Sequence, residues 1–444
     1  METPVYEFLR RYDDDRMVRF HMPGHKGKPF LGCEPLDLTE VKGADALYEA
    51  DGVIARSEAN ATALFGSRRT LYSTEGSSQC IRAMLYLALM NRPAGTRPLI
   101  VAARNVHKAF VYAAALLDFE VVWLWPGESR SLCGCPVSED TLERTLAALD
   151  APPAAVYLTS PDYLGGMADI SALSAVCHRH GTILTVDNAH GAYLRFLNPS
   201  RHPLELGADL CCDSAHKTLP VLTGGAYLHI GKTAPAALAE QAKAALALFG
   251  STSPSYLTLA SLDLCNRYLA GDYPVRLEET AARLEKLCRQ LIQKGWRLEP
   301  GDPLRLTVCA PSGMTGLQLA ERLRAARVEC EYADRDFLVL MATPENTPEE
   351  LERLADALGE NRLAWAETAP LPLAGGERMC SIRQALFAPH ETIPAERALG
   401  RVCGAPTVSC PPAIPIAVSG ERIGPEALAL FRYYEVQTVD VLRG

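Results

Sequence analysis

The sequence predicts an α/β protein whose large domain contains a mostly parallel central sheet. Between residues 53 and 265, short runs of β-branched and apolar residues alternate with helix-like segments, the pattern of repeated strand–helix–strand units. One run, residues 182–187, ends at Asp187. A later segment carries Lys217 between two hydrophobic stretches, residues 208–212 and 226–230. In such sheets, polar groups at the carboxyl ends of buried strands mark the place where ligands bind.

The elements of this large domain follow from local patterns in chain order. Strands are predicted at residues 70–73, 99–103, 121–125, 154–159, 182–187, 208–212 and 226–230. Helices are predicted at residues 54–65, 81–90, 109–117, 137–149, 170–180 and 234–248. Ser138, followed by two acidic residues, is typical of a helix N-terminus, and Gly66 and Gly181 are typical of helix ends.

The rest of the chain divides into smaller parts. A short helix at residues 4–11 belongs to an N-terminal arm, residues 1–45, and the large domain follows over residues 46–270. An amphipathic helix at 274–294 opens a small α+β domain, residues 271–368, that continues as strand–helix–strand–helix. A Pro/Gly-containing linker at 369–376 precedes a C-terminal subdomain, residues 377–444.

Composition excludes several functional classes. The 444 residues carry a net charge of −9, which favours neither nucleic acid nor an anionic membrane. No apolar run reaches the roughly 20 residues of a membrane helix, and the charged N-terminus lacks a signal core. The 14 cysteines show no disulfide-type spacing, and Cys133-x-Cys135 has no second pair at zinc-site spacing. We therefore expect a cytoplasmic protein without a metal.

Lys217 and Asp187 together suggest a chemistry. Burying an ammonium group is costly, so a lysine between buried strands is usually neutralised, paired or bonded covalently. One such bond is an imine with the aldehyde of pyridoxal 5′-phosphate (PLP). PLP also needs an acid that keeps its pyridine nitrogen protonated, and Asp187 at a strand end suits that role. The alternative is a solvated or ion-paired lysine.

Six blocks in order resemble one known family. They are HMPGHKG at 21–27, RNVHKA at 104–109, LTSPDYLGG at 158–166, VDNAHGA at 186–192, SAHKTLP at 214–220 and STSPSY at 251–256. Together they resemble the Orn/Lys/Arg decarboxylases in their short bacterial form, without the N-terminal wing domain of larger members. The resemblance implies a fold-type-I PLP-dependent transferase-like large domain with smaller α+β lobes.

The resemblance also implies residues that hold the phosphate of PLP. These are Ser77 and Ser78 at a helix N-terminus, Ser214 and His216 beside Lys217, and Thr252 reaching across to the neighbouring subunit. Free N–H groups at a helix N-terminus favour anions, although such a turn is also an ordinary helix cap.

Three more residues match positions near the cofactor ring. The resemblance implies that His107 stacks on the ring, Ser160 lies at the phenolic oxygen, and His190 orients Asp187 or the substrate carboxylate. Each also has a plain structural interpretation: a helix cap for His107, a Ser-Pro-Asp turn for Ser160, and a hydrogen-bonded polar residue for His190.

Four positions lack a settled role. Glu75, Asn188 and Ala413 depart from the residues usual in the family. Glu421, after the stiff CPPAIPIAVSG run, could meet a cationic side chain or be a surface glutamate.

The expected function is PLP-dependent α-decarboxylation of arginine, lysine or ornithine, as in polyamine biosynthesis, with Lys217, Asp187, His107 and His190 as catalytic residues. The expected partner is a second copy of the chain, in a homodimer or higher homo-oligomer with active sites at the interface. One alternative is another reaction on the same fold, such as aminotransfer, which would normally need an arginine clamp for the α-carboxylate. Another is a non-catalytic regulatory homologue. Such a homologue would be expected to lack Lys217 or Asp187, and both are present.

Overall fold

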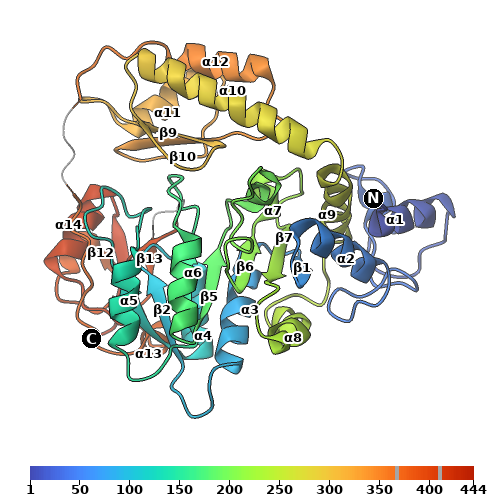
Figure 1. The fold of residues 1–444 in the computed structure, drawn as a ribbon, viewed down its shortest axis with the longest axis horizontal. Coiled ribbons are helices and arrows are strands. Elements are labelled where there is room, and N and C mark those ends of the chain that lie inside the picture. The colour runs from blue at the N-terminus through green and yellow to red at the C-terminus, as the bar shows by residue number, and fades with distance from the viewer. Residues whose placement is uncertain (366–369, 409–412) are drawn as a thin grey trace. The chain divides into compact units, whose positions relative to one another are not determined.

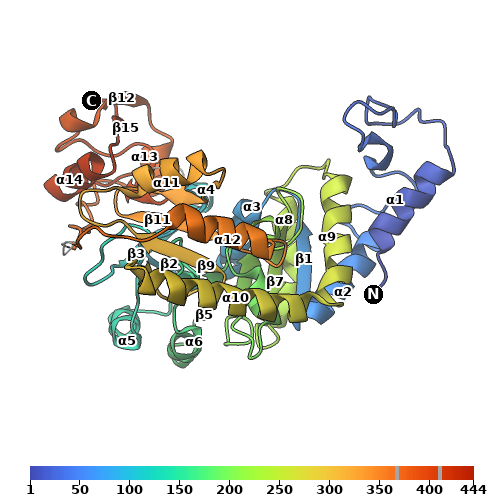
Figure 2. The same cartoon turned by 90° about the horizontal axis from the view of Figure 1, so that it is seen from above.

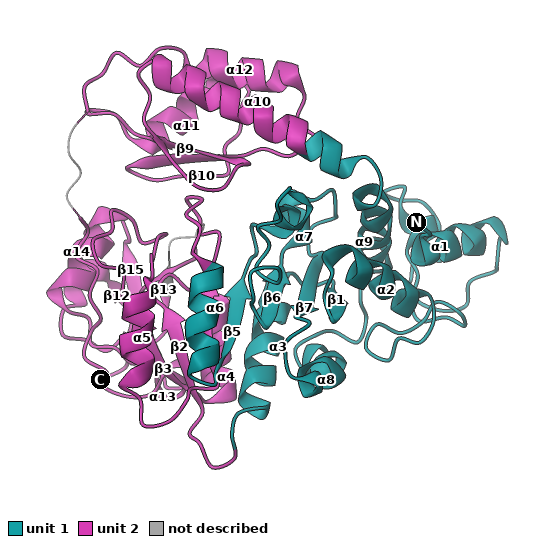
Figure 3. Ribbon diagram, in the orientation of Figure 1, with its two compact units in different colours: residues 1–93, 170–277 teal, residues 94–169, 278–444 magenta. Residues whose placement is uncertain are grey.

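Helices and strands alternate along the computed structural model, which describes residues 1–365, 370–408 and 413–444 (Figure 1 and Figure 2). The chain divides into two units, and each is described by itself (Figure 3). Unit 1 comprises residues 1–93 and 170–277, and unit 2 comprises residues 94–169 and 278–444. Within the described ranges, no helix combines the length and the apolar character that crossing a lipid bilayer requires.

The strands of unit 1 lie in the order β1-β7-β6-β5. Their bounds are β1 Arg69–Ser73, β5 Ile183–Asp187, β6 Leu210–Asp213 and β7 Ala226–Ile230. β5 and β6 are parallel, whereas β7 runs antiparallel to both β6 and β1. These strands are almost wholly buried, which explains why each reads as a continuous apolar run rather than an alternating one.

The helices of unit 1 are α1 Pro4–Asp14, α2 Val53–Phe65, α3 Ser77–Met90, α6 Ile170–Arg179, α7 Ala215–Thr218, α8 Ala236–Ala247 and α9 Tyr256–Leu269, with 3-10 turns η1 Glu34–Leu36 and η2 Ala192–Phe196. α2 ends as predicted at Gly66, which adopts a left-handed φ of 65°. α1 packs against α2 and α9, and its first N–H groups donate to the Asp263 carboxylate at 2.9 and 3.0 Å.

Unit 2 contains three parallel strands in the order β4-β2-β3. These are β2 Leu99–Ala103, β3 Glu120–Leu124 and β4 Ala155–Thr159, and the helices α4 Lys108–Leu117 and α5 Glu139–Ala147 belong with them. The fully buried Phe110 of α4 joins helix and strands, because its ring lies 4.7 Å from Tyr157 and 5.8 Å from Trp123, centroid to centroid. As predicted, Ser138 caps α5 by accepting a hydrogen bond from the Thr141 N–H.

A four-stranded antiparallel sheet follows in the order β10-β11-β9-β8, covered by three helices. The bounds are α10 Tyr273–Gln293, β8 Leu298–Glu299, β9 Arg305–Cys309, α11 Gly316–Ala325, β10 Tyr332–Ala333, β11 Phe337–Met341 and α12 Pro348–Leu358. The predicted apolar face of α10 contributes Leu284, Leu287 and Leu291 to the core of this lobe. The strand–helix–strand–helix order predicted from the sequence is confirmed here.

The C-terminal residues form a second small core. The elements are α13 Ile382–Leu386, β12 His390–Pro394, η3 Ala395–Arg397, β13 Thr407–Val408, β14 Pro415–Ala417, α14 Pro425–Tyr433 and β15 Thr438–Leu442. β12 pairs with β15 and β13 with β14, both antiparallel. Linker position 369 and the Pro-Pro of the CPPAIP run lie outside the described residues. The domain boundaries proposed above stay predictions.

Candidate active site

Lys217 lies on α7, the single helical turn between β6 and β7 in unit 1. The turn forms because Ser214 leaves β6 in an extended conformation and its carbonyl accepts a hydrogen bond from the Lys217 N–H at 3.0 Å. The lysine side chain is half-buried, and its Nζ lies 3.0 Å from Nε2 of His190. The predicted position of Lys217 between two buried strands is confirmed.

Asp187 and His190 come from the end of the neighbouring strand. β5 and β6 are parallel, and Asp187 pairs with Cys212 near the end of β6. The Asp187 side chain is 2% exposed, and its Oδ1 accepts a hydrogen bond from the Ala189 N–H at 3.2 Å. His190 follows in the same turn and is 4% exposed. Because both strands end at one edge, the structure brings Lys217 beside the turn that carries Asp187 and His190.

Ser77 and Ser214 also meet, although 137 positions separate them in the chain. Ser214 Oγ donates a hydrogen bond to Ser77 Oγ at 2.8 Å. Ser77 opens α3, so the first N–H groups of that helix lack partners within it. Gly76 adopts a φ of 72°, and a side chain added there would meet no atom within 4 Å. Two hydroxyls and a helix N-terminus therefore border open space, a cradle that fits a phosphate group.

The other predicted phosphate ligands are less engaged. Ser78 follows Ser77 on α3 and is half-exposed. His216 donates through Nδ1 to the Gly225 carbonyl at 3.0 Å, and burial lowers the pKa of this imidazole. Thr252 lies in an exposed loop. The Glu75 carboxylate, a departure from the family pattern, accepts a hydrogen bond from the Ser251 N–H in that loop.

His107 and Ser160 belong to unit 2. His107 is the N-cap of α4, where its Nδ1 accepts a hydrogen bond from the Ala109 N–H at 3.1 Å. Ser160 follows β4, is 2% exposed, and accepts a hydrogen bond from the Ala168 N–H at 3.1 Å. The capping interpretation of His107 is thus confirmed. The roles of both residues at a cofactor ring stay predictions.

Arg104 is a residue that the sequence analysis left without a role. It follows β2, is 7% exposed, and donates to the carbonyls of Pro415 and Ile416 at 2.8 and 3.0 Å. Its guanidinium also lies 3.8 Å from Glu421, where burial raises the pKa of the glutamate. Glu421 is therefore an internal partner of Arg104 rather than a surface residue. An arginine directly after a buried strand was the available sequence signal.

The same guanidinium fixes the C-terminal segment beside α4. It stacks on the rings of Trp123 and Trp125, each 5.2 Å away. Next to it, the Lys108 N–H donates to the carbonyl of Ala413 at 2.9 Å. Ala413 has a φ of 60°, a left-handed backbone conformation that favours glycine. The segment thus reaches the N-terminus of the helix that His107 caps.

Asp213 is a second residue that sequence reasoning missed. This fully buried carboxylate accepts hydrogen bonds from Nε2 of His202 and of His229, both at 3.0 Å, and from Nδ2 of Asn188 at 2.7 Å. Burial alone would raise the pKa of Asp213, but the two imidazoles lower it well below its ordinary value. Among the described residues, His202, Cys211 and Asp213 also lie close enough for a metal ion, yet hydrogen bonding accounts for the arrangement.

Asp213 joins the two turns of the site. Asn188 directly follows Asp187, and Asp213 directly precedes Ser214. The Asn188 N–H also donates to the carbonyl of Cys212 at 3.0 Å. The polar contacts of Asp213 therefore tie the strand end that carries Asp187 to the segment that carries Lys217.

Comparisons with known proteins identify the family and the relatives of this chain. A model of the Orn/Lys/Arg decarboxylase family, major domain, matches residues 3–310. The chain is 29% identical over 462 residues to uncharacterized protein YaaO of Bacillus subtilis, covering 96% of this chain and 93% of that protein. It is 27% identical over 471 residues to the arginine decarboxylase of the same organism, covering 96% and 92%.

Solved structures share the fold. The Francisella novicida lysine decarboxylase LdcF matches with a TM-score of 0.82 at 16% identity, over 99% of this chain and 81% of that chain. The Sphingomonas wittichii serine palmitoyltransferase matches with a TM-score of 0.57 at 17% identity, over 79% and 82%.

The chain has the fold type I that these structures share, as the sequence predicts. More narrowly, the chain belongs to the Orn/Lys/Arg decarboxylase family and is a PLP-dependent amino-acid decarboxylase.

Proposed function

We propose that the protein uses PLP to decarboxylate a basic amino acid, and that arginine is the substrate to test first. The observation that carries the proposal is the 3.0 Å approach of Lys217 Nζ to His190 Nε2, in the turn that follows the buried Asp187. Arginine comes first because similar full-length relatives are named arginine decarboxylases.

The residues of unit 1 fit the parts of this cofactor. Lys217 would bond to its aldehyde, and Asp187 would face its pyridine nitrogen as a buried anion. Ser77, Ser214 and the N-terminus of α3 would hold its phosphate. When bound, PLP supplies an electron sink for the electron pair left on the α-carbon as the carboxylate departs as CO2.

Proton transfer falls to groups of this chain. His190 and Lys217 share a hydrogen bond, so a proton can pass between the imidazole and the amine. One of the two would return a proton to the α-carbon to complete the amine. Asp187 would take no part in that transfer, because as a buried anion its role would be to keep the ring nitrogen protonated.

We also propose a homodimer. The N-terminal arm exposes apolar side chains that a monomer would leave in water, with exposed fractions from 56% to 95%: Met17, Val18, Phe20, Met22, Phe30 and Leu31. Exposed apolar groups gathered on one segment are typical of an interaction surface. Thr252 lies in an exposed loop, where it would be free to complete the phosphate site of a partner subunit. A cytoplasmic location stays a prediction.

The test is a product screen with purified, PLP-loaded protein. Arginine, lysine and ornithine are supplied separately, and CO2, amine and keto acid are measured. We expect CO2 and amine in equal amounts from one of the three, and no product from the Lys217→Ala variant. Keto acid without CO2 would instead indicate aminotransfer. Wild-type protein without cofactor absorbance, unchanged by borohydride, would indicate a non-catalytic homologue.

A further inference from the structure

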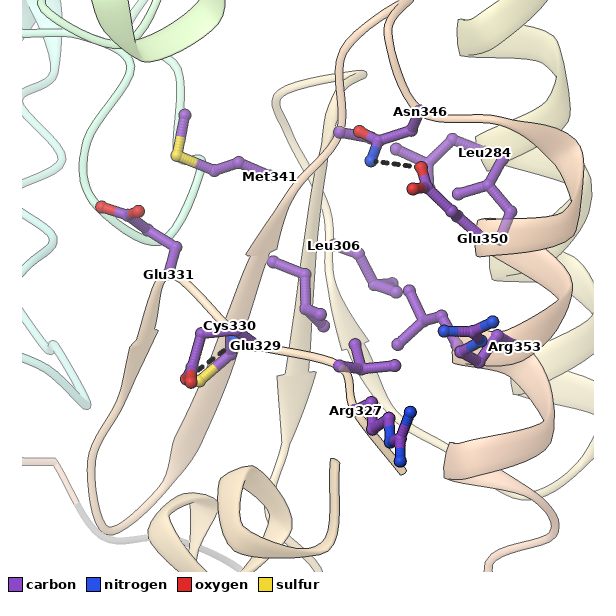
Figure 4. A pocket seen from close by; sticks show the side chains of 15 residues that line it. Leu284, Leu306, Arg327, Glu329, Cys330, Glu331, Met341, Asn346, Glu350 and Arg353 are labelled. Atoms are coloured by element: carbon purple, nitrogen blue, oxygen red, sulfur yellow. Dashed lines mark hydrogen bonds between the residues drawn. The ribbon is translucent and has the colours of Figure 1, made fainter. Parts of the chain in front are cut away.

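A pocket of about 380 Å³ lies in the α+β lobe formed by residues 284–354 (Figure 4). It is bordered by α10, α12, the strands β9 and β11, and the segment that leads from α11 to β10. None of the residues assigned above to PLP or substrate lines it. Its volume is within the usual range for small-molecule sites.

The floor of the pocket is apolar. Four leucines from four different elements form it, and all belong to the core of the lobe: Leu284, Leu306, Leu340 and Leu354. Val328, Leu351 and Met341 add partly buried apolar surface around them. A hydrocarbon group placed there would be removed from water on several sides, which favours binding.

The carboxylates at the rim already have partners. Both oxygens of Glu329 accept from Arg324 Nε, at 2.9 and 3.1 Å. Glu331 accepts from the Tyr163 hydroxyl at 2.8 Å. Glu350 closes the capping box of α12 by accepting from the Thr347 N–H at 3.0 Å. Glu329 is therefore paired with a cation, whereas Glu331 and Glu350 accept from uncharged donors and keep their negative charge.

Two arginines at the rim have neither a salt bridge nor a side-chain hydrogen bond in the described part of the chain. They are Arg327 and Arg353, and both side chains are exposed. Figure 4 shows their guanidinium groups on the same side of the pocket, away from Glu331 and Met341. Glu350, three positions before Arg353 on α12, interacts electrostatically with it, so Arg327 is the cation of this side without such a carboxylate among the described residues.

The backbone at Arg327 adds an independent observation. Arg327 follows the end of α11 with a φ of 62°, a left-handed conformation that favours glycine. A β-carbon at such a position carries a steric cost. Glycine at this position would remove that cost, so the side chain of Arg327 can be deleted without straining the backbone.

We propose that this pocket binds a small amphiphilic anion, with its hydrocarbon body on the leucine floor and its carboxylate or phosphate head between Arg327 and Arg353. Guanidinium groups bind both heads through paired charge-assisted hydrogen bonds. The site is separate from the proposed decarboxylation and does not depend on it.

The test is calorimetric titration of full-length, PLP-loaded protein with decanoate and, separately, decyl phosphate, below the concentrations at which they form micelles. We expect saturable binding at one site, and the tighter of the two probes identifies the head group. Arg327→Gly and Arg353→Gln should each weaken binding roughly tenfold or more. Arg289→Gln, at an exposed arginine of α10 outside the pocket, should bind as wild type.

The thermal stability of Arg327→Gly shows whether a loss of binding comes from misfolding. Glycine suits the left-handed backbone, so the thermal midpoint should equal or exceed that of wild type while binding is lost. The proposal is overturned if neither probe saturates, or if both arginine variants bind as wild type does. Equal binding of decyltrimethylammonium would also overturn it, because a cation gains nothing from two guanidinium groups.

Discussion

The Asp213→Asn substitution should destabilise the protein although it changes almost no volume. The buried carboxylate accepts three strong hydrogen bonds, two from imidazoles at 3.0 Å and one from the Asn188 amide at 2.7 Å, and a weak fourth from the Cys211 thiol at 3.6 Å. An asparagine offers one oxygen and one NH2 group in their place. If the oxygen of the new asparagine faces His202 and His229, its NH2 group meets the NH2 group of Asn188. If the amide is turned the other way, its NH2 group meets the N–H groups of both imidazoles.

The magnitude follows from the number of bonds affected. All three lose the charge of their acceptor, and at least one donor is left facing another donor. Hydrogen bonds to charged groups contribute about 1.5–3 kcal/mol each, and breaking a buried charged pair costs about 3–5 kcal/mol. Asn188 can recover part of this by rotating its amide, because its Oδ1 is buried without a hydrogen-bond partner among the described residues. We therefore expect a loss of about 3 kcal/mol.

The assay is urea unfolding followed by tryptophan fluorescence, with Asp209→Asn as the control. Asp209 is also buried, but it accepts from one backbone N–H and from a His178 that is 43% exposed, so its loss should cost about 1 kcal/mol. A result for Asp213→Asn within about 0.5 kcal/mol of wild type would refute the reasoning, since that is the range of ordinary surface substitutions.

The same reasoning predicts how the free energy of unfolding that Asp213 contributes depends on pH. The pKa of Asp213 is lowered in the folded protein, so its contribution is complete above the unfolded value of about 3.9 and is lost as the pH falls toward the folded value. The difference between wild type and Asp213→Asn should therefore be constant from pH 7 to about pH 5 and shrink below about pH 4. A difference that grows in acid would contradict this assignment.

Three further predictions concern the cofactor, the C-terminal segment and the oligomer. Ser214→Ala should weaken PLP binding roughly tenfold in titrations of the apo-protein, because it removes a proposed phosphate donor, whereas Ser171→Ala at an exposed position of α6 should not. Arg104→Met should lower the free energy of unfolding by about 3 kcal/mol and recover partly when Glu421→Gln is added; no recovery would argue against their pairing. Phe20→Ser with Leu31→Ser should shift the mass in analytical ultracentrifugation from dimer to monomer, and an unchanged mass would exclude the arm from the interface.

The strand end at Asp187 and the turn that carries Lys217 were largely predictable, because the sequence signals for both are local. A β-branched run ending in Asp187 and a lysine between two apolar stretches are features of a few neighbouring residues. Parallel strands in such a sheet end at a common edge, so the approach of Lys217 to His190 followed once β5 and β6 were recognised. The helices α2, α6 and α10 were likewise legible from their periodicity and end signals.

The residues that support the site were not predictable in this way. Asp213 reads as one more polar residue at a strand end, and nothing local indicates that His202 and His229 would share its carboxylate. Arg104 meets Pro415 across 311 positions, and Ser214 meets Ser77 across 137. Contacts at such separations depend on which strands pair and in which register, which local patterns do not specify.

The sequence by itself determined the order of most strands and helices between residues 53 and 248, the family and the two residues expected to anchor the cofactor, since periodicity, caps and short motifs act over a few residues. Only the tertiary structure decided which distant polar groups meet, because a buried donor or acceptor must find a partner among whatever the packed elements bring to it. The hydrogen bonds that meet at Asp213 and the two arginines that meet at the lobe pocket are both results of that packing.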